Sequence, residues 1–180
     1  RLRRQRQMCI RDRISGARFL SYSCFDEGAG DFRRTKFVRC VSNAARRLHI
    51  LFDRTVMGTV LVTGGAGYIG SHTVRALLAA DREVVVLDNL SAGHRESVKD
   101  VRLVEADVGD VGVVQSVLRD FDITAVMHFA AVLSVGESVK DPQPYYLTNV
   151  SSTLALLRAM REESVPHFIF SSTAAVYGAP

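Results

Sequence analysis

The sequence predicts a doubly wound α/β fold, in which helices cover both faces of a parallel sheet. Short runs rich in β-branched residues alternate with amphipathic stretches between residues 59 and 171, as expected when each strand is followed by a helical crossover. A glycine-rich turn joins the first of these runs to the first amphipathic stretch. No apolar run of about 18 residues or more occurs, so nothing in the sequence suggests a membrane-spanning helix.

Five segments have the composition of buried parallel strands. The first two, TVLVT and EVVVL, are nearly unbroken aliphatic and β-branched runs, which suits strands covered on both faces. The predicted strands are Thr59–Thr63, Glu83–Leu87, Val101–Glu105, Ile123–His128 and His167–Ser171.

Helices are predicted between these strands. After the glycine turn, apolar residues recur at three- and four-residue spacing and form one face: Ile69, Thr73, Val74, Leu77 and Leu78. Further helical stretches surround Val111–Arg119 and Tyr145–Arg161. Pro142 and Pro144 suit the opening of the longer one, because proline is tolerated in a first helical turn.

The turn after the first strand is Gly64-Gly65-Ala66-Gly67-Tyr68-Ile69-Gly70. In dinucleotide-binding folds the first glycine of such a motif permits the tight turn, the second lets the backbone approach a pyrophosphate, and the third packs helix against strand. A lone glycine motif is weak evidence, but the strand before it and the helix after it are the context that this function requires. The sequence therefore predicts an NAD-binding Rossmann fold, with phosphates at the helix N-terminus.

Acidic residues follow the next two strands. Asp88, 18 residues beyond Gly70, can accept hydrogen bonds from the adenosine ribose and repel a 2′-phosphate, which favours NAD over NADP; the alternative is a turn or capping residue. Asp107 could bond the adenine amino group or be a solvated turn residue, and both remain open. Ligands bind at the carboxyl ends of such strands, so Phe129-Ala130-Ala131 and Ser171-Ser172-Thr173 are further candidate segments.

The first 56 residues differ from the rest. They hold 14 basic and 5 acidic residues, whereas residues 57–180 hold 9 and 14. Their apolar residues follow no sustained period, so we predict no helix or strand there. We expect residues 1–56 to be a basic extension that is non-native or disordered, and residues 57–180 to be the Rossmann domain. A nucleic-acid-binding arm and an organelle transit peptide are the alternatives.

Several classes of function are disfavoured. The three cysteines, Cys9, Cys24 and Cys40, form no CxxC pair and support neither a disulfide framework nor a zinc site, so we expect a reducing, cytoplasmic setting. The histidines lack ligand spacing, and no metal is expected. The acidic balance of residues 57–180 argues against a nucleic-acid partner.

Six segments together resemble the UDP-glucose 4-epimerase family of the extended short-chain dehydrogenase/reductase superfamily. The resemblance covers residues 57–180 and none of residues 1–56. The glycine motif alone fits many extended reductases, whereas the SHT that follows it, DNLSAGH and VGESV narrow the choice to the 4-epimerases. The segments are TGGAGYIGSHTVRALL (Thr63–Leu78), DNLSAGHRESV (Asp88–Val98), HFAA (His128–Ala131), VGESV (Val135–Val139), YYLTNV (Tyr145–Val150) and FSSTAAVYG (Phe170–Gly178).

The resemblance implies roles for individual residues. Those at positions of the family's NAD contacts are Gly64, Gly67, Tyr68, Ile69, Gly70, Asp88, Asn89, Asp107, Val108, Phe129, Ala130, Ala131, Asn149 and Ser171. Those on the sugar side are Ser172, Thr173 and Tyr177, with Thr173 at the position of the catalytic hydroxyl.

The implied activity is NAD-dependent epimerisation of UDP-glucose and UDP-galactose at C4, in galactose metabolism, by a homodimer. In that family a tyrosine phenolate takes the proton of the 4-hydroxyl while the C4 hydride passes to NAD, and the 4-keto sugar is reduced on its other face. Thr173 would hydrogen-bond the reacting oxygen and help pass its proton to the tyrosine.

Two departures from the family pattern matter. The catalytic Tyr-x-x-x-Lys is absent, and the sequence stops seven residues beyond Thr173; the segment Ala131–Val135 lacks the lysine that members usually carry beside the cofactor. We therefore expect an N-terminal fragment without the substrate domain, inactive by itself. The alternatives are a nucleotide-sugar dehydratase or decarboxylase, which needs an acidic residue that Thr173-Ala174-Ala175 lacks, and a catalytically silent NAD-binding module.

Deletion of residues 1–56 is expected to leave the affinity for NAD⁺ unchanged, because the predicted binding residues all lie beyond Met57. Isothermal titration of both chains with NAD⁺ measures this. A clear loss of affinity in the shortened chain would contradict the expectation.

Overall fold

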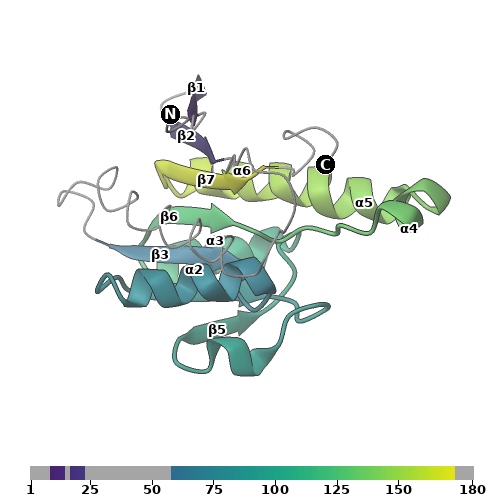
Figure 1. The fold of residues 1–180 in the computed structure, drawn as a ribbon. Coiled ribbons are helices and arrows are strands. Elements are labelled where there is room, and N and C mark those ends of the chain that lie inside the picture. Colours follow the sequence, from purple (N-terminus) through teal and green to yellow (C-terminus); the bar gives the residue numbers. More distant parts are fainter. Residues whose placement is uncertain (1–8, 15–16, 23–57, 173–180) are drawn as a thin grey trace, which may run out of the picture.

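The structure is a computed structural model that describes residues 9–14, 17–22 and 58–172. Its centre is a parallel sheet (Figure 1) whose strands lie in the order β7-β6-β3-β4-β5. The chain steps outward from β3 to β5 and then crosses back to place β6 on the other side of β3, the strand order of a doubly wound sheet. The predicted fold class is confirmed. The strands are β3 (Thr59–Thr63), β4 (Val84–Asp88), β5 (Arg102–Glu105), β6 (Ile123–His128) and β7 (His167–Ser171).

The predicted bounds of β3, β6 and β7 are confirmed, and β4 and β5 begin one residue later than predicted. The long helix predicted around Tyr145–Arg161 is present as an uninterrupted helical segment, and it contains a π-helical turn. Within the described part of the chain, no helix is both long and apolar enough to cross a membrane. The helical elements are α2 (Tyr68–Leu78), η1 (Arg95–Val98), α3 (Val111–Asp120), α4 (Val135–Lys140), α5 (Gln143–Tyr146), η2 (Leu147–Ser151) and α6 (Ser152–Glu162).

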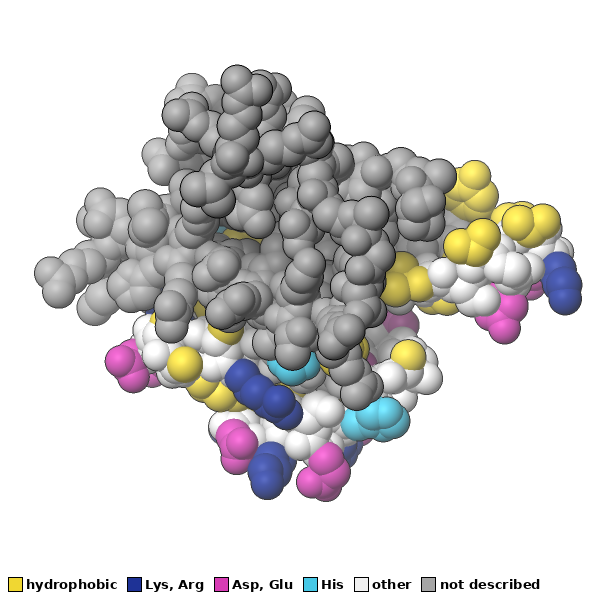
Figure 2. Space-filling model, viewed as in Figure 1, with side chains coloured by type: hydrophobic (Ala, Val, Ile, Leu, Met, Phe, Trp, Pro, Cys, Tyr) yellow, Lys and Arg dark blue, Asp and Glu magenta, His cyan; other side chains and the backbone are white. Residues whose placement is uncertain are grey.

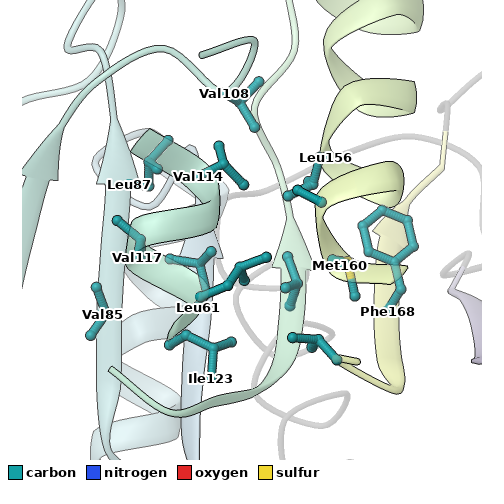
Figure 3. Packing of buried hydrophobic residues seen from close by; sticks show 14 residues of the cluster. Leu61, Val85, Leu87, Val108, Val114, Val117, Ile123, Leu156, Met160 and Phe168 are labelled. Atoms are coloured by element: carbon teal, nitrogen blue, oxygen red, sulfur yellow. The ribbon is translucent and has the colours of Figure 1, made fainter. Parts of the chain in front are cut away.

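Alternate residues of the strands face two separate apolar layers. On one face Leu61 and Val126 pack in a cluster with residues of α3 and α6, including Val114 and Leu156; Figure 3 shows this packing from close by. On the other face the neighbouring strand residues pack with α2. Burial on both faces explains why β3 and β4 are nearly continuous apolar runs rather than alternating ones.

Helix α2 buries three of the five residues on the face that the sequence predicts, and Ile69 of that face is partly buried. Thr73, Val74 and Leu77 are buried, whereas Leu78 is 37% exposed. Leu78 is the last residue of the helix.

Two further strands precede the central sheet. Strand β1 (Cys9–Ile14) pairs antiparallel with β2 (Ala17–Tyr22), and β2 pairs parallel with β7 (Figure 1). The prediction of no regular element in residues 1–56 is therefore wrong for these two stretches. Pairing with a sheet edge uses backbone N–H and C=O groups, so it requires no periodic side-chain pattern.

Candidate functional site

The carboxyl ends of β3, β4 and β6 meet at one edge of the sheet. The N–H of Gly64 donates to the carbonyl of Leu87 over 2.9 Å, and the N–H of Phe129 donates to the carbonyl of Thr63 over 2.9 Å. The loops that leave these strands are thus hydrogen-bonded to the neighbouring strand at their first residue. Ligands of open α/β sheets bind at this edge, where the strand order reverses.

At two positions of the glycine turn, neighbouring backbone atoms leave no room for a Cβ. Gly64 has φ +69°, and a Cβ there would lie 2.5 Å from the backbone nitrogen of Ala130. A Cβ at Gly70 would lie 2.2 Å from the carbonyl oxygen of Gly64. At Gly67, in contrast, the nearest atom to an added Cβ would be the Gly64 oxygen at 3.3 Å. The turn therefore holds helix, strand and β6 loop together while leaving the backbone at Gly67 open to a ligand.

Helix α2 presents an uncompensated N-terminus at this edge. Its N-cap is Gly67, no side chain caps it, and its first turn contains no acidic residue. Tyr68 is 48% exposed, and Ile69 is partly buried. The N–H groups of a first helical turn lack intrahelical partners and carry the positive end of the dipole. The arrangement suits a phosphate group.

Asp88 is fixed beside this turn. It is 7% exposed; one carboxylate oxygen accepts the N–H of Ala66 over 2.9 Å, and the other accepts the N–H of Leu90 over 2.8 Å. Leu90 has φ +57°, a left-handed conformation that costs about 1 kcal/mol or more in a branched residue. Asp88 is therefore a turn residue and also a carboxylate locked to the glycine turn, with lone pairs left for a further donor.

The predicted adenine-side residues lie on the next loop. The amide of Asn89 donates to Asp107 over 2.9 Å, and the other Asp107 oxygen accepts the N–H of Gly109 over 2.8 Å. Both side chains are exposed, so they remain accessible to a ligand. The side chain of Val108 is buried in the core cluster with α3 and α6, so a ligand at this loop can meet only the Val108 backbone.

The loop after β6 is held by Asn149. The Asn149 amide donates to the carbonyl of Val132 over 2.9 Å and accepts the N–H of Val132 over 2.8 Å. Asn149 lies in η2, and π-helical turns occur frequently at functional sites. Phe129 and Ala130 are partly buried and Ala131 is exposed, so the predicted turn and Asn149 do come together.

A buried histidine that the sequence did not single out as a site residue lies beneath this loop. His128 is 2% exposed; its Nδ1 lies 2.6 Å from Oγ1 of Thr63, and its Nε2 lies 3.0 Å from Oγ1 of Thr153. The rings of Phe168 and Phe170 lie at centroid distances of 6.0 and 5.9 Å. The sequence feature that could have indicated this contact is a polar residue, Thr63 or His128, at the end of each of the apolar strands β3 and β6.

The remaining predicted residues follow β7. Ser171 and Ser172 are partly buried at the same edge of the sheet, whereas Thr173 and Tyr177 lie outside the described residues. Among the residues that the structure describes, no three His, Cys, Asp or Glu side chains are grouped so that they could hold a metal ion.

Residues 60–180 match the family model of the NAD dependent epimerase/dehydratase family. The UDP-glucose 4-epimerase of Lactobacillus helveticus is 50% identical over 122 residues, which are 67% of this chain and 37% of that protein. That of Azospirillum brasilense is 51% identical over 122 residues, 67% of this chain and 35% of that protein.

Solved structures agree. The crystal structure of UDP-glucose 4-epimerase from Brucella ovis in complex with NAD superposes with a TM-score of 0.66 at 45% identity, over 69% of this chain and 38% of that one. The UDP-Glc/GlcNAc 4-epimerase of Campylobacter jejuni gives a TM-score of 0.64 at 41% identity, over 69% and 40%. The chain thus spans well under half the length of these relatives.

The buried histidine predicts a loss of stability in mild acid. Desolvation lowers the pKa of His128 from 6.5 to about 4, so between these values the unfolded chain binds a proton that the folded chain does not. Neutral His128 makes its full contribution to the free energy of unfolding above pH 6.5. This contribution, about 3 kcal/mol in total, is lost as the pH falls toward 4.

Urea unfolding at pH 7 and pH 5 measures this for the wild type and for His128→Gln, which has no titrating ring. The wild type is expected to lose more stability than the variant. Equal losses would show that His128 does not carry the effect.

Proposed function

This chain belongs to the NAD dependent epimerase/dehydratase family, and we propose that it forms the NAD-binding part of a UDP-glucose 4-epimerase. The observation that carries the proposal is the bond between Asp88 and the N–H of Ala66. It fixes a carboxylate suited to ribose hydroxyls next to the helix N-terminus suited to phosphates. Two relatives that are 50% and 51% identical over 67% of this chain, and the similar structure from Brucella ovis, are UDP-glucose 4-epimerases.

The described residues fit NAD along the whole edge. We propose that the backbone from Gly67 to Gly70 holds the pyrophosphate, that Asp88 and Asn89 hold the adenosine ribose, and that Asp107 with the Val108 backbone meets the adenine. The loop Phe129–Ala131, with Asn149 and Ser171, would lie on the nicotinamide side. When bound, NAD supplies reversible hydride transfer at the sugar C4 carbon.

The residues of this chain that would orient the sugar follow β7. Ser172, Thr173 and Tyr177 are the proposed contacts of a UDP-sugar, and Thr173 would hydrogen-bond the reacting oxygen and hold its proton in place. The position of these residues supports the proposal, because β7 is parallel to β3 and β6 and ends at the same edge of the sheet.

We propose that residues 57–180 are the unit that binds the cofactor and that residues 1–56 contribute no contact to it. The support is the family match, which covers residues 60–180 and leaves residues 1–56 outside it. The proposed setting is the cytoplasm, where the scattered Cys9, Cys24 and Cys40 would remain thiols.

A homodimer is the proposed assembly. Large hydrophobic side chains are exposed along α4, α5 and α6 (Figure 2 shows hydrophobic side chains gathered at the projecting end of the molecule). Three of them, Leu147, Val150 and Leu154, recur at helical spacing and are 53%, 47% and 61% exposed. An apolar stripe of this kind favours contact with another protein surface, and a second copy of this chain would bury it.

Replacement of Asp88 by Asn is expected to weaken NAD⁺ binding about tenfold and to narrow the preference for NAD⁺ over NADP⁺. The variant loses the negative charge and leaves one backbone N–H facing an amide donor. Isothermal titration with each dinucleotide measures both effects.

The matched control is Asp110→Asn, which alters the exposed N-cap of α3 and should bind as the wild type does, since Asn caps helices as well as Asp. An unchanged NAD⁺/NADP⁺ ratio in Asp88→Asn would refute the assignment.

Replacement of Leu154 by Glu is expected to shift the chain from dimer to monomer, because a carboxylate would have to be buried at the interface. Light scattering after gel filtration gives the mass. Leu78→Glu is the control, because Leu78 is an exposed leucine of α2 outside the apolar stripe, and it should remain dimeric. A Leu154→Glu dimer of unchanged stability would exclude this interface.

A further inference from the structure

We propose that His128 is a positioning residue for NAD. Its imidazole is neutral and protonated at Nε2, and it fixes the relative positions of Thr63 before the glycine turn, the β6 loop and the turn that contains Asn149. The inference rests on the proposed function. It begins from a side chain that lies at the last position of β6, directly before Phe129, and that contacts two hydroxyls from distant parts of the chain.

The direction of each hydrogen bond follows from chemistry. Oγ1 of Thr153 lies 2.9 Å from the carbonyl oxygen of Asn149, and because a carbonyl can only accept, the single Thr153 hydroxyl proton is used there. The contact between Thr153 and His128 then needs the proton on Nε2. With Nε2 protonated and the ring neutral, Nδ1 is an acceptor, so Thr63 must donate its hydroxyl proton to it.

The surroundings of the ring keep it neutral. Strand β7 supplies the phenyl rings of Phe168 and Phe170, with Phe170 stacked at an interplanar angle of 17°, while β3 and α6 supply the two uncharged hydroxyls. Burial alone lowers the pKa of His128, with no contribution from a charged neighbour. A buried site without a counter-charge disfavours the imidazolium, in which both ring nitrogens are donors and Nδ1 can no longer accept the Thr63 hydroxyl proton.

The chain of bonds joins the segments that are proposed to hold NAD. Thr63 is the residue before Gly64 and the register partner of His128. The Thr153 hydroxyl donates to the backbone carbonyl of Asn149, and the Asn149 side chain forms hydrogen bonds with both the N–H and the C=O of Val132. An error in any of these bonds would shift the glycine turn relative to the β6 loop, so the network acts on the cofactor through other residues and not by touching it.

The test compares the affinity of the full 180-residue chain for NAD⁺ in three variants, each measured well below its melting temperature. Thr153→Val removes the hydroxyl and is expected to weaken binding about fivefold to tenfold, the change that accompanies loss of one hydrogen bond. Thr153→Ser restores the hydroxyl and should bind within about twofold of the wild type. Thr124→Val is the matched control, because it removes a hydroxyl at the opposite end of β6, and it too should bind as the wild type does.

A second measurement needs no cofactor and no destabilising variant. Nitrogen-15 NMR of the wild-type imidazoles should show one ring with the proton on Nε2 that stays neutral from pH 7 to about pH 5.5, assigned to His128 by its change in Thr153→Val, or in Thr153→Ser if the valine variant does not fold. A proton on Nδ1, or a charged ring at pH 6, would overturn the proposal.

The outcomes separate the two ideas. Wild-type affinity in Thr153→Val, or failure of Thr153→Ser to restore it, would leave the proposed function intact and reject the positioning role. Absence of NAD⁺ binding by the wild type would reject the proposed function and the positioning role together, even with the expected tautomer present.

Discussion

Backbone packing at Gly64 is the contact on which the candidate site depends. The turn brings Gly64 against the backbone of Ala130 on one side and against Gly70 of α2 on the other, so two loops and a helix meet at one point. No side chain fits there, and the left-handed φ of Gly64 would itself disfavour one. Because this contact is made by backbone atoms, the separation of the two loops is set by van der Waals radii and cannot relax as a side-chain contact could.

Two buried polar side chains near this contact, Asp88 and His128, obtain their hydrogen-bond partners in different ways. A polar group removed from water must find partners. Asp88 finds two backbone N–H groups and thereby ties the β4 end to the glycine turn. His128 finds two hydroxyls and ties β6 to β3 and α6. The partners come from loops, a strand end and the first turn of α6. These segments must also be correctly placed, so the same hydrogen bonds satisfy the polar groups and order the edge of the sheet.

How much of this could be predicted from the sequence depends on the range of the interaction. The bounds of β3 and β6 were predictable because burial on both faces leaves a nearly continuous apolar run. The role of His128 was not, because its partners Thr63 and Thr153 lie 65 and 25 residues away in sequence. The pairing of β2 with β7 could not be predicted from the sequence either, because backbone hydrogen bonding requires no periodic pattern of side chains. The burial of Val108 depends on packing by α3 and α6, which a loop position does not reveal.

The π-helical turn η2 shows why a 3.6-residue period does not predict which side chains of this segment face the core. A π turn adds a residue to the helical repeat, which changes the phase between the apolar residues before it and those after it. Beyond it, Leu156, Ala159 and Met160 face the core, while within it Asn149 faces the β6 loop and Leu147 and Val150 face outward. One continuous helical segment thus meets the core, the candidate cofactor loop and the outer surface, and no single 3.6-residue pattern could satisfy all three.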